Sequence, residues 1–385
     1  MVHHTHRLAV AVAVLALVAG ACSSAATAVP ATPAPATPAP VTAAPATPAP
    51  ATPAPASMAP ASMAPASAAA AAGAITVVNI PKQVNNPYFD VAYKGMQQAA
   101  TDLGGTVSYV GPSAAVATQQ VPFIQTATTQ HASAIVVSAD DPTAIAPALK
   151  AAMAAGVKVV GYDSSPAVGA YNVFVNQADT NGIGTGLVQM ACDEAPNCTG
   201  EIAVLSAAET ATNQNAWIAA MKVTLKQAKY KGLVWDGVVY GNDDPQISTT
   251  QAQGLLQAHP NLKVIVAPTT VGIVAAAQVV KAAGKTGKVF VTGLGTPVGM
   301  EAYVKGGQAP EFALWNVTSL GYLAYAVAVD LVSGKITGAV GETFTVNGLN
   351  NNQPYTIGPN NVVVLGPPFV FNKANIDQYV KSFGF

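Results

Sequence analysis

The chain has 385 residues, of which 51% are hydrophobic and only 9% charged, and its formal net charge is -1. This length allows two domains of ordinary size. The 17 Lys and Arg residues are balanced by 18 Asp and Glu residues, so no basic surplus exists that would favour nucleic acid as a partner.

The first 22 residues have the layout of a secretory signal peptide. An apolar run from Leu8 to Val18 follows a short His-bearing start, and it is too short for a transmembrane helix. Small residues then lead into Cys22. The stretch "AGAC" resembles a bacterial lipobox, although Ala19 replaces the usual larger aliphatic residue. We expect Cys22 to be lipidated in an extracytoplasmic, membrane-anchored lipoprotein; the alternative is a cleaved signal with an unrelated cysteine.

Residues 23–73 repeat "ATPAP" and "ASMAP" and contain no charged side chain. Such a run cannot bury enough apolar surface to offset the entropy of ordering. We therefore predict an extended Pro/Ala-rich tether that lifts the following domain off the membrane.

Two further cysteines, Cys192 and Cys198, lie six positions apart in "ACDEAPNCTG". In an exported chain this spacing predicts one local disulfide. A metal site is the alternative, but no His or third Cys lies nearby in sequence. We expect no metal ion and no cofactor.

From residue 74 onward, short β-branched runs alternate with longer segments of helical apolar spacing. In the first helical segment Phe89, Ala92, Met96, Ala99 and Leu103 recur every three or four positions. Strand and helix in alternation indicate a parallel sheet covered by helices. The strands expected in this first series are 75–80, 106–110, 134–138 and 157–162.

A second series of the same kind follows, and residues 149–164 and 279–295 both run from amphipathic helix through a glycine to a buried strand. Two similar α/β units with a cleft between them are the simplest interpretation. The strands expected in the second series are 201–206, 233–240, 263–267, 288–293 and 311–315.

The loops that leave these strands carry amides, hydroxyls, carboxylates and aromatic rings, as in "PKQVNNPYF", "YDSSP" and "SAAETATNQN". Ligands of open α/β sheets bind beyond the carboxyl ends of the strands. This set of side chains suits a neutral polyhydroxylated ligand, because carboxylates and amides pair with hydroxyls and rings cover C–H faces.

These residues carry a resemblance to a known family. The motifs "IPKQVNNPYFDVAYKGMQQAA", "VFVNQAD", "ATNQNAWI", "YGNDD" and "VTGLGTP" resemble type I periplasmic binding proteins of the ribose, autoinducer-2 and rhamnose group, and most closely its rhamnose branch. The resemblance covers about residues 75–385. It implies a two-lobed α/β fold, each lobe a parallel sheet flanked by helices, with three crossovers forming a hinge.

The resemblance also implies a function. The lobes would close on one monosaccharide, with L-rhamnose as the best guess and autoinducer-2 or another pentose or polyol as the alternative. The closed monomer would dock on a membrane permease whose ATPase drives import. We place the crossovers near 177–180, 315–318 and 338–342. The N-terminal lobe is then 74–178 and 316–340, and the C-terminal lobe 179–315 and 341–385.

Several positions match ligand contacts of the group. Tyr88 and Phe89 match its ring-stacking aromatics, and Asp163 matches the carboxylate that receives sugar hydroxyls. To these we add Asp140 and Asp243, carboxylates at strand ends that could otherwise be turn formers. The remaining matched positions, at which the group has ligand contacts, are Lys82, Thr143, Asn213, Gln214, Pro268, Thr270 and Trp315.

Three of these positions depart from the autoinducer-2 pattern, which has Asp at 143, Asp at 213 and Ala at 270. "TNQN" agrees instead with the rhamnose branch. Other interpretations stay open: Thr212 or Asn213 could be an N-cap, Trp217 could be core, and Lys82 could be a solvated charge.

An enzyme is the less favoured alternative. The domain has two histidines, His131 and His259, each expected to cap a helix C-terminus. No nucleophile elbow, phosphate loop or His-containing metal spacing occurs. A hydrolase with two carboxylates has no fixed spacing and stays open. A transcriptional regulator is excluded, because an exported chain meets no DNA.

Overall fold

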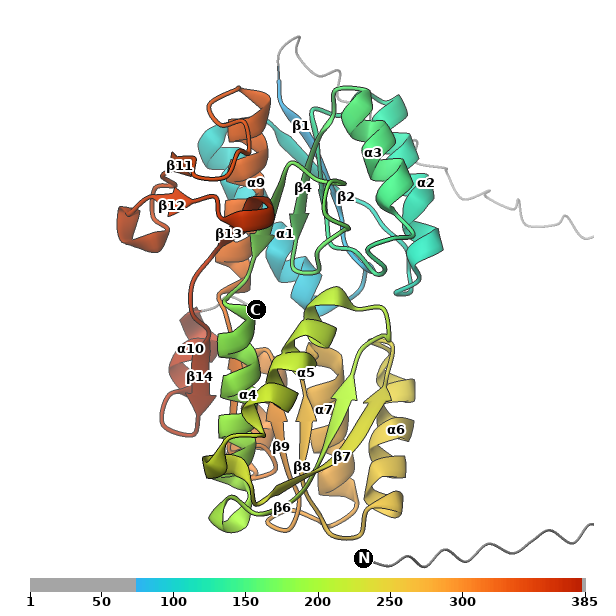
Figure 1. Cartoon of the computed structure of the whole chain (residues 1–385), viewed down its shortest axis with the longest axis vertical. Helices are drawn as coiled ribbons and strands as arrows, with labels where there is room; N and C mark the ends of the chain where they lie inside the picture. Colours follow the sequence, from blue (N-terminus) through green and yellow to red (C-terminus); the bar gives the residue numbers. More distant parts are fainter. Residues whose placement is uncertain (1–73, 383–385) are drawn as a thin grey trace, which may run out of the picture. The chain divides into compact units, whose positions relative to one another are not determined.

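The computed structural model describes residues 74–382 (Figure 1). The predicted signal peptide, Cys22 and the Pro/Ala-rich tether lie outside the described residues. No helix within 74–382 is both long and apolar enough to cross a membrane.

The first lobe is built on a parallel sheet whose strand order is β13-β5-β4-β3-β1-β2. The side chains of β3 are all buried, as expected for a strand covered on both faces. The bounds are β1 (Thr76–Ile80), β2 (Thr106–Tyr109), β3 (Ala134–Val137), β4 (Lys158–Tyr162), β5 (Val173–Asn176) and β13 (Val362–Val364). Strand β5 was not among the strands expected from the sequence.

Four helices cover the two faces of this sheet (Figure 1). Helix α1 packs closely against α9, while α2 packs against α3 on the other face. Three of the predicted apolar positions in α1, Ala92, Met96 and Ala99, are fully buried, whereas Leu103 at its end is 44% exposed. The bounds are α1 (Pro87–Leu103), α2 (Ala117–Thr129), α3 (Ala146–Ala154) and α9 (Val317–Val332).

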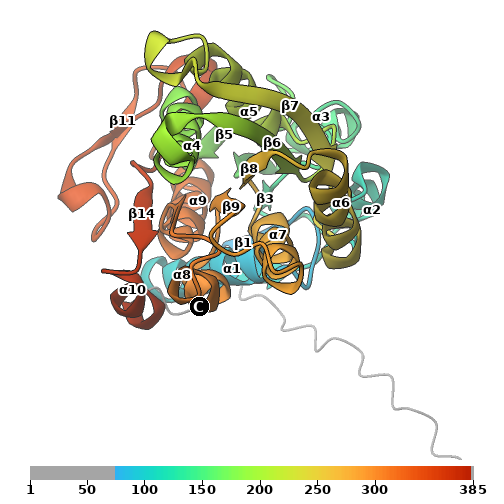
Figure 2. The ribbon, with the colours of Figure 1, turned by 90° about the horizontal axis from the view of Figure 1, so that it is seen from below.

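The second lobe contains a parallel sheet of order β7-β6-β8-β9. Helices α4 and α5 cover one face and α6 and α7 the other (Figure 2). The strands are β6 (Gly200–Ser206), β7 (Leu233–Tyr240), β8 (Leu262–Ala267) and β9 (Phe290–Gly293). The helices are α4 (Thr180–Glu194), α5 (Thr212–Thr224), α6 (Pro245–Ala258), α7 (Thr270–Ala282) and α8 (Pro297–Lys305).

The C-terminal segment differs from expectation. Strand β13 pairs with β5, so it extends the first sheet, and Val363 is fully buried there. Only β14 (Phe369–Asn372), which pairs antiparallel with β10 (Glu311–Leu314), and α10 (Ile376–Ser382), which packs on α8, join the second lobe. The assignment of 341–385 to the second lobe was therefore wrong for 341–364.

The physical reason is an open edge: β5 had no outer neighbour, and a short valine run can supply both hydrogen bonds and apolar side chains there. The third passage between the lobes consequently falls at 365–368. The small elements before it are β11 (Thr343–Phe344) and β12 (Tyr355–Thr356), which form an antiparallel pair. Short 3-10 turns are η1 (Pro196–Cys198), η2 (Ala228–Tyr230), η3 (Asn350–Asn352) and η4 (Pro359–Asn361).

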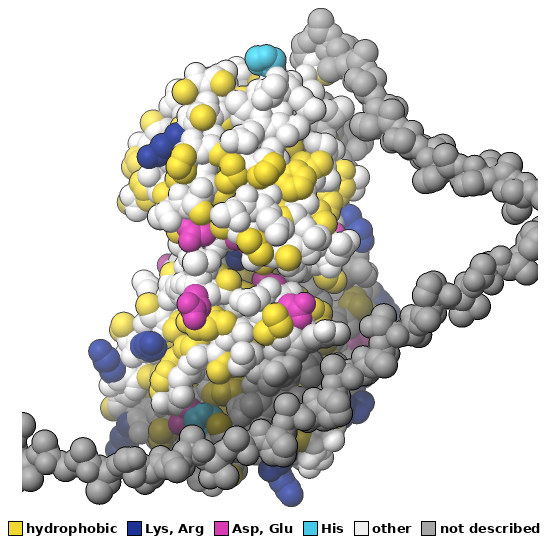
Figure 3. Space-filling model, turned by 90° about the vertical axis from the view of Figure 1, so that its right-hand side faces the viewer, with side chains coloured by type: hydrophobic (Ala, Val, Ile, Leu, Met, Phe, Trp, Pro, Cys, Tyr) yellow, Lys and Arg dark blue, Asp and Glu magenta, His cyan; other side chains and the backbone are white. Residues whose placement is uncertain are grey.

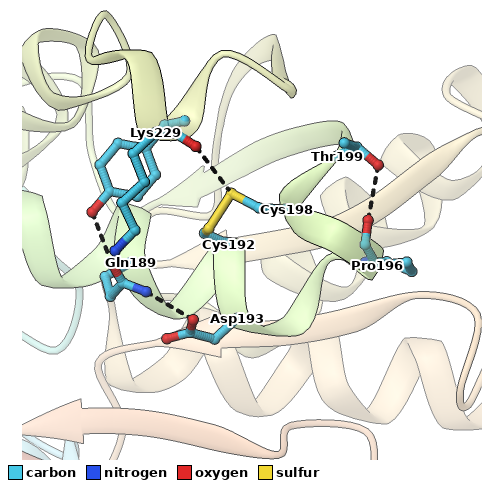
Figure 4. The surroundings of a disulfide bond; sticks show 8 residues. Gln189, Cys192, Asp193, Pro196, Cys198, Thr199 and Lys229 are labelled. Carbon is cyan, nitrogen blue, oxygen red and sulfur yellow. Dashed lines mark hydrogen bonds between the residues drawn. A yellow bond between two sulfur atoms is a disulfide. The ribbon is translucent and has the colours of Figure 1, made fainter.

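The predicted disulfide joins Cys192 at the end of α4 to Cys198 in η1, with the two Cα atoms 4.3 Å apart (Figure 4). In the same turn the Thr199 hydroxyl donates to the Pro196 carbonyl oxygen at 2.8 Å. The bond therefore secures the turn that leads from α4 into β6. Of the glycines in "GIGTGL", Gly184 serves helix packing: a Cβ there would lie 2.4 Å from the Ala220 Cβ on α5, whereas one on Gly186 would meet no heavy atom within 4 Å.

Candidate ligand-binding site

A cavity of about 360 Å³, including the solvent at its mouth, lies between the loops of the two lobes. All of the predicted ligand residues except Asp140 and Thr143 line it. The complete lining is Lys82, Asn86, Tyr88, Phe89, Asp163, Asn213, Gln214, Trp217, Asp243, Pro268, Thr269, Thr270, Leu294, Leu314 and Trp315. Acidic side chains gather on the face where the lobes meet (Figure 3).

Asp163 is the hydrogen-bonding centre of the cavity. It follows β4 directly with φ 57°, a left-handed conformation that is uncommon outside glycine. Its Oδ1 accepts hydrogen bonds from the Tyr88 hydroxyl at 3.2 Å and the Asn213 amide at 3.1 Å. Its Oδ2 accepts from the Ser138 hydroxyl at 2.7 Å and lies 3.8 Å from the Lys82 ammonium. Lys82 is only 4% exposed, so the solvated-charge interpretation was wrong.

The aromatic wall is itself hydrogen-bonded to this centre. The Trp315 indole N–H donates to the Tyr88 oxygen at 3.0 Å, and Tyr88 donates onward to Asp163. Phe89 and Trp315 both stand edge-on to Tyr88, and Trp217 lies 5.8 Å from Trp315 between ring centroids. Burial, and then the charge of Asp163, raise the pKa of Tyr88 well above its ordinary value, which keeps this hydroxyl a donor.

Two further buried carboxyl groups lie near Lys82. Asp243, with φ 51°, accepts a hydrogen bond from the Thr269 hydroxyl, and burial raises its pKa. Burial raises the pKa of Asp140 to about 8, against the lowering effect of Lys82. Asp140 is therefore mostly protonated at neutral pH and can donate a hydrogen bond. Asp244, which follows Asp243 in the chain, is the N-cap of α6 and accepts from the backbone N–H groups of the first turn.

The amides at the start of α5 divide their roles. Gln214 uses its oxygen to accept from Ser206 and from the Ala207 N–H, both at 2.7 Å, so it is anchored to the end of β6. Asn213 accepts from the Gln214 N–H at 2.8 Å and donates to Asp163. The N-cap residue is Ala211, which makes no side-chain cap. Asn213 therefore satisfies a backbone donor of the first turn and also serves the cavity.

Thr143 is a correction to the predicted site. Its side chain is exposed, and both its hydroxyl and its N–H donate to Asp141 at 2.7 Å. It belongs to the turn before α3 rather than to the cavity. Asp140 lies behind the lining, where its backbone N–H donates to the buried Gln120 side chain at 3.0 Å.

Sequence reasoning missed several lining residues. Asn86 caps α1 by accepting from the Tyr88 N–H at 3.1 Å and also faces the cavity. Trp217, left open between core and wall, is 2% exposed and serves as both. Leu294 and Leu314 carried no polar signal that could have revealed them, and Thr269 stood between two residues that were predicted.

Hydrogen bonds connect the loops of the two lobes around the cavity. The Thr210 hydroxyl donates to the Asp140 carbonyl oxygen at 2.8 Å, and the Gln83 amide donates to the Asp243 carbonyl oxygen at 3.2 Å. The Thr212 hydroxyl donates to the Ser165 carbonyl oxygen at 3.3 Å. The structure is therefore a closed arrangement of the two lobes.

A family profile described as a periplasmic binding protein domain matches residues 77–336. The chain is 40% identical to the solute-binding protein of an ABC transporter from Clostridium phytofermentas, solved with bound L-rhamnose. That match covers 80% of this chain and 98% of the other, with a TM-score of 0.78.

Two other relatives match different shares of the chain. LsrB from Clostridium saccharobutylicum, in complex with AI-2, is 27% identical, with 79% of this chain and 99% of the other covered and a TM-score of 0.73. The D-ribose/D-allose-binding protein of Pseudomonas aeruginosa is 23% identical over 225 residues, which are 56% of this chain and 68% of that protein.

Proposed function

Because this chain belongs to the family of periplasmic binding protein domains, we propose that it captures a monosaccharide between its lobes and delivers it to an ABC permease outside the cytoplasm. L-rhamnose is the first candidate. The observation that carries the proposal is the Asp163 centre, where one carboxylate is held by four polar side chains beside a wall of buried rings. Such a site pairs with sugar hydroxyls and covers a C–H face.

The apolar part of the cavity favours a deoxy sugar. Leu294 and Leu314 are 2% and 1% exposed and line the cavity together with Trp217 and Trp315. A hydroxyl placed against these side chains would lose its hydrogen bonds to water without replacement. L-rhamnose carries a methyl group where an ordinary hexose carries a hydroxymethyl group, and a methyl group needs no such partner.

The mechanism we propose is binding without chemistry. Sugar hydroxyls would bridge groups of the first lobe, such as Asp163 and Lys82, to groups of the second, such as Asn213 and Asp243. Only the closed form offers both sets, so the ligand shifts the population toward closure. The closed form would then be the one that the permease and its ATPase recognise.

Isothermal titration calorimetry of the purified protein tests this proposal. We expect L-rhamnose to bind most tightly in a panel with ribose, other pentoses, hexoses, polyols and autoinducer-2. L-mannose, which differs from L-rhamnose only by the added hydroxyl, should bind about ten- to a hundredfold more weakly. Asp163→Asn should weaken rhamnose binding by at least about tenfold, whereas Asp102→Asn, an exposed carboxylate on α1, should not.

A response to another sugar with none to rhamnose would keep the importer role and overturn the ligand. Autoinducer-2 as the tightest ligand would favour the alternative receptor. Turnover of a sugar in the same samples would favour a carbohydrate-active enzyme.

Anchoring through a lipidated Cys22 remains part of the proposal. The mass of the N-terminal peptide of the membrane-associated protein would reveal the acyl groups. An unmodified cysteine would contradict the proposed lipid anchor.

A further inference from the structure

Three side chains of types that ligate metal ions lie together at the end of the second lobe that is remote from the cavity. Glu201 stands near the start of β6, Asp236 lies in the first half of β7, and His259 is the C-cap of α6. The candidate ligand atoms of these three residues all lie within 4.8 Å of one another. The ligand cavity, in contrast, is built from loops that follow the strand ends.

Irregularities of the sheet place these side chains. Ile202 of β6 pairs with Trp235 of β7, but Val204 pairs with Val238, so β7 has one extra residue between these pairs. The extra residue falls at Asp236–Gly237, and Gly237 has φ 120°, which favours glycine. Bulges of this kind redirect a side chain and are enriched near functional sites.

A second irregularity lies on the other side of Glu201. Glu201 pairs with Leu262 of β8, whereas Ile202 pairs with Val264, so Lys263 is the extra residue there. Both irregularities therefore adjoin Ile202, the residue that follows Glu201 in β6. The path of β6, β7 and β8 at this end of the sheet departs from regular pairing where the three ligand side chains meet.

One buried polar atom of the cluster lacks a hydrogen-bond partner among the described residues. Asp236 Oδ2 is buried and receives no hydrogen bond from the described residues, and it lies 3.4 Å from His259 Nδ1. The side chains of His259 and Asp236 are 28% and 13% exposed, so the cluster reaches solvent although Asp236 Oδ2 itself is buried.

We propose that Glu201, Asp236 and His259 bind a divalent transition-metal ion, with Zn²⁺ as the best fit. Zinc ligands lie about 2.0–2.1 Å from the ion, which in tetrahedral geometry separates neighbouring ligand atoms by about 3.3–3.4 Å. The Asp236–His259 distance already has this value. Imidazole favours Zn²⁺ over the oxygen-preferring Mg²⁺ and Ca²⁺.

Three protein ligands would leave one position for water. The ion would tie together β6, β7 and the turn between α6 and β8. This site departs from the expectation of no metal, because its residues are spread over 201–259 and no sequence spacing joins them. The proposal is independent of the sugar, since the cluster and the cavity share no residue.

Calorimetric titration of the chelator-treated full-length protein with Zn²⁺ tests the site. We expect wild type to bind Zn²⁺, and His259→Ala and Asp236→Asn each to weaken this site by at least about tenfold. The matched control is His131→Ala, an exposed histidine of the first lobe, which should leave the titration unchanged. Because His3, His4 and His6 could also bind zinc, the difference between wild type and His259→Ala decides rather than the stoichiometry.

Thermal unfolding supplies a second readout. Zn²⁺ should raise the Tm of wild type and of His131→Ala but not that of Glu201→Gln, which keeps the side-chain size while removing the charge. Mg²⁺ at the same concentration should have little effect. Identical zinc titrations of wild type and His259→Ala, or no zinc binding by wild type at all, would overturn the proposal. If His259→Ala does not fold, the Asp236→Asn and Glu201→Gln variants decide in its place.

Discussion

At the scale of single residues, the cavity depends on carboxyl groups held in unfavourable environments. Asp163 and Asp243 both adopt positive φ, which costs a non-glycine residue about 1–3 kcal/mol. Three carboxyl groups share one ammonium, Lys82, whose charge lowers the pKa of Asp140 and Asp243 while burial raises both more strongly. Fixing these polar groups in position therefore lowers the stability of the empty protein.

Asp140 makes the stability of the folded protein depend on pH in a way that can be measured. Its pKa is about 8 in the folded protein against an ordinary 3.8, so the folded state binds the extra proton between about pH 4 and 8. The contribution of Asp140 to stability therefore falls as pH rises through this window, by at most about 1.4 kcal/mol per pH unit. Asp140→Asn removes this contribution, and its stability relative to wild type should grow steadily from pH 4 to 8.

Urea unfolding at several pH values would measure this difference. Glu209→Gln, which neutralises an exposed carboxylate in the loop before α5, is the matched control and should follow the wild-type pH slope. A slope for Asp140→Asn equal to that of wild type would show that Asp140 is ionised throughout the window.

At the scale of elements, the first lobe depends on the close contact of α1 with α9. A Cβ on Gly95 would lie 1.9 Å from the Thr318 carbonyl oxygen, and one on Gly321 would lie 1.8 Å from the Ala92 carbonyl oxygen. Each helix thus presents a glycine to the backbone of the other. Because α1 begins at the cavity with Tyr88 and Phe89, and α9 follows Trp315 almost directly, this contact positions the aromatic wall.

The contact predicts opposite effects for two glycine substitutions. Gly321→Ala should destabilise the protein by about 1–3 kcal/mol, because the helices must separate. Gly254→Ala in α6 meets no heavy atom within 4 Å, and it should stabilise by about 0.5–1 kcal/mol through helix propensity. Chemical denaturation of both variants measures this; equal effects of the two changes would argue against a packed α1–α9 contact.

At the scale of the whole molecule, the closed arrangement rests on few direct bonds between the lobes. Thr210, Thr212 and Gln83 each donate to a backbone carbonyl oxygen of the opposite lobe, and Asn213 donates to the Asp163 carboxylate. The neutral hydrogen bonds contribute only about 0.5–1.5 kcal/mol each, and the bond to the carboxylate about 1.5–3 kcal/mol. A ligand that bridges the lobes can therefore decide between open and closed forms, which a transport receptor requires.

Thr210→Val tests this balance. The substitution removes a bond that exists only when the lobes are closed, so rhamnose affinity should fall about two- to tenfold although Thr210 is not in the cavity lining. Thr250→Val removes a hydroxyl that bonds within α6 to the Gln246 carbonyl oxygen and should leave affinity unchanged. Calorimetry compares the two, and equal affinities of both variants with wild type would contradict a role of Thr210 in closure.

The order of strands and helices could be predicted because side-chain periodicity and glycine stops are local properties of the chain. Most residues of the cavity could also be predicted, because parallel strands bring the loops that follow them to one edge of each sheet. Thr143 was wrongly placed in the cavity because it forms hydrogen bonds with the nearby Asp141 in a turn. The position of Thr143 along the chain does not reveal these hydrogen bonds. Trp217 and Leu294 were missed or undecided because apolar lining and apolar core have the same local pattern.

The sequence by itself determined two α/β units, a polar and aromatic cleft, and a local disulfide between Cys192 and Cys198. Only the tertiary structure decided that β13 completes the first sheet, that Asp163 is the centre of the cavity, and that Glu201, Asp236 and His259 converge. The reason is that pairing at an open sheet edge, burial of a carboxyl group and convergence of three distant side chains depend on contacts between residues far apart in the chain. The local periodicity of side chains does not predict such contacts.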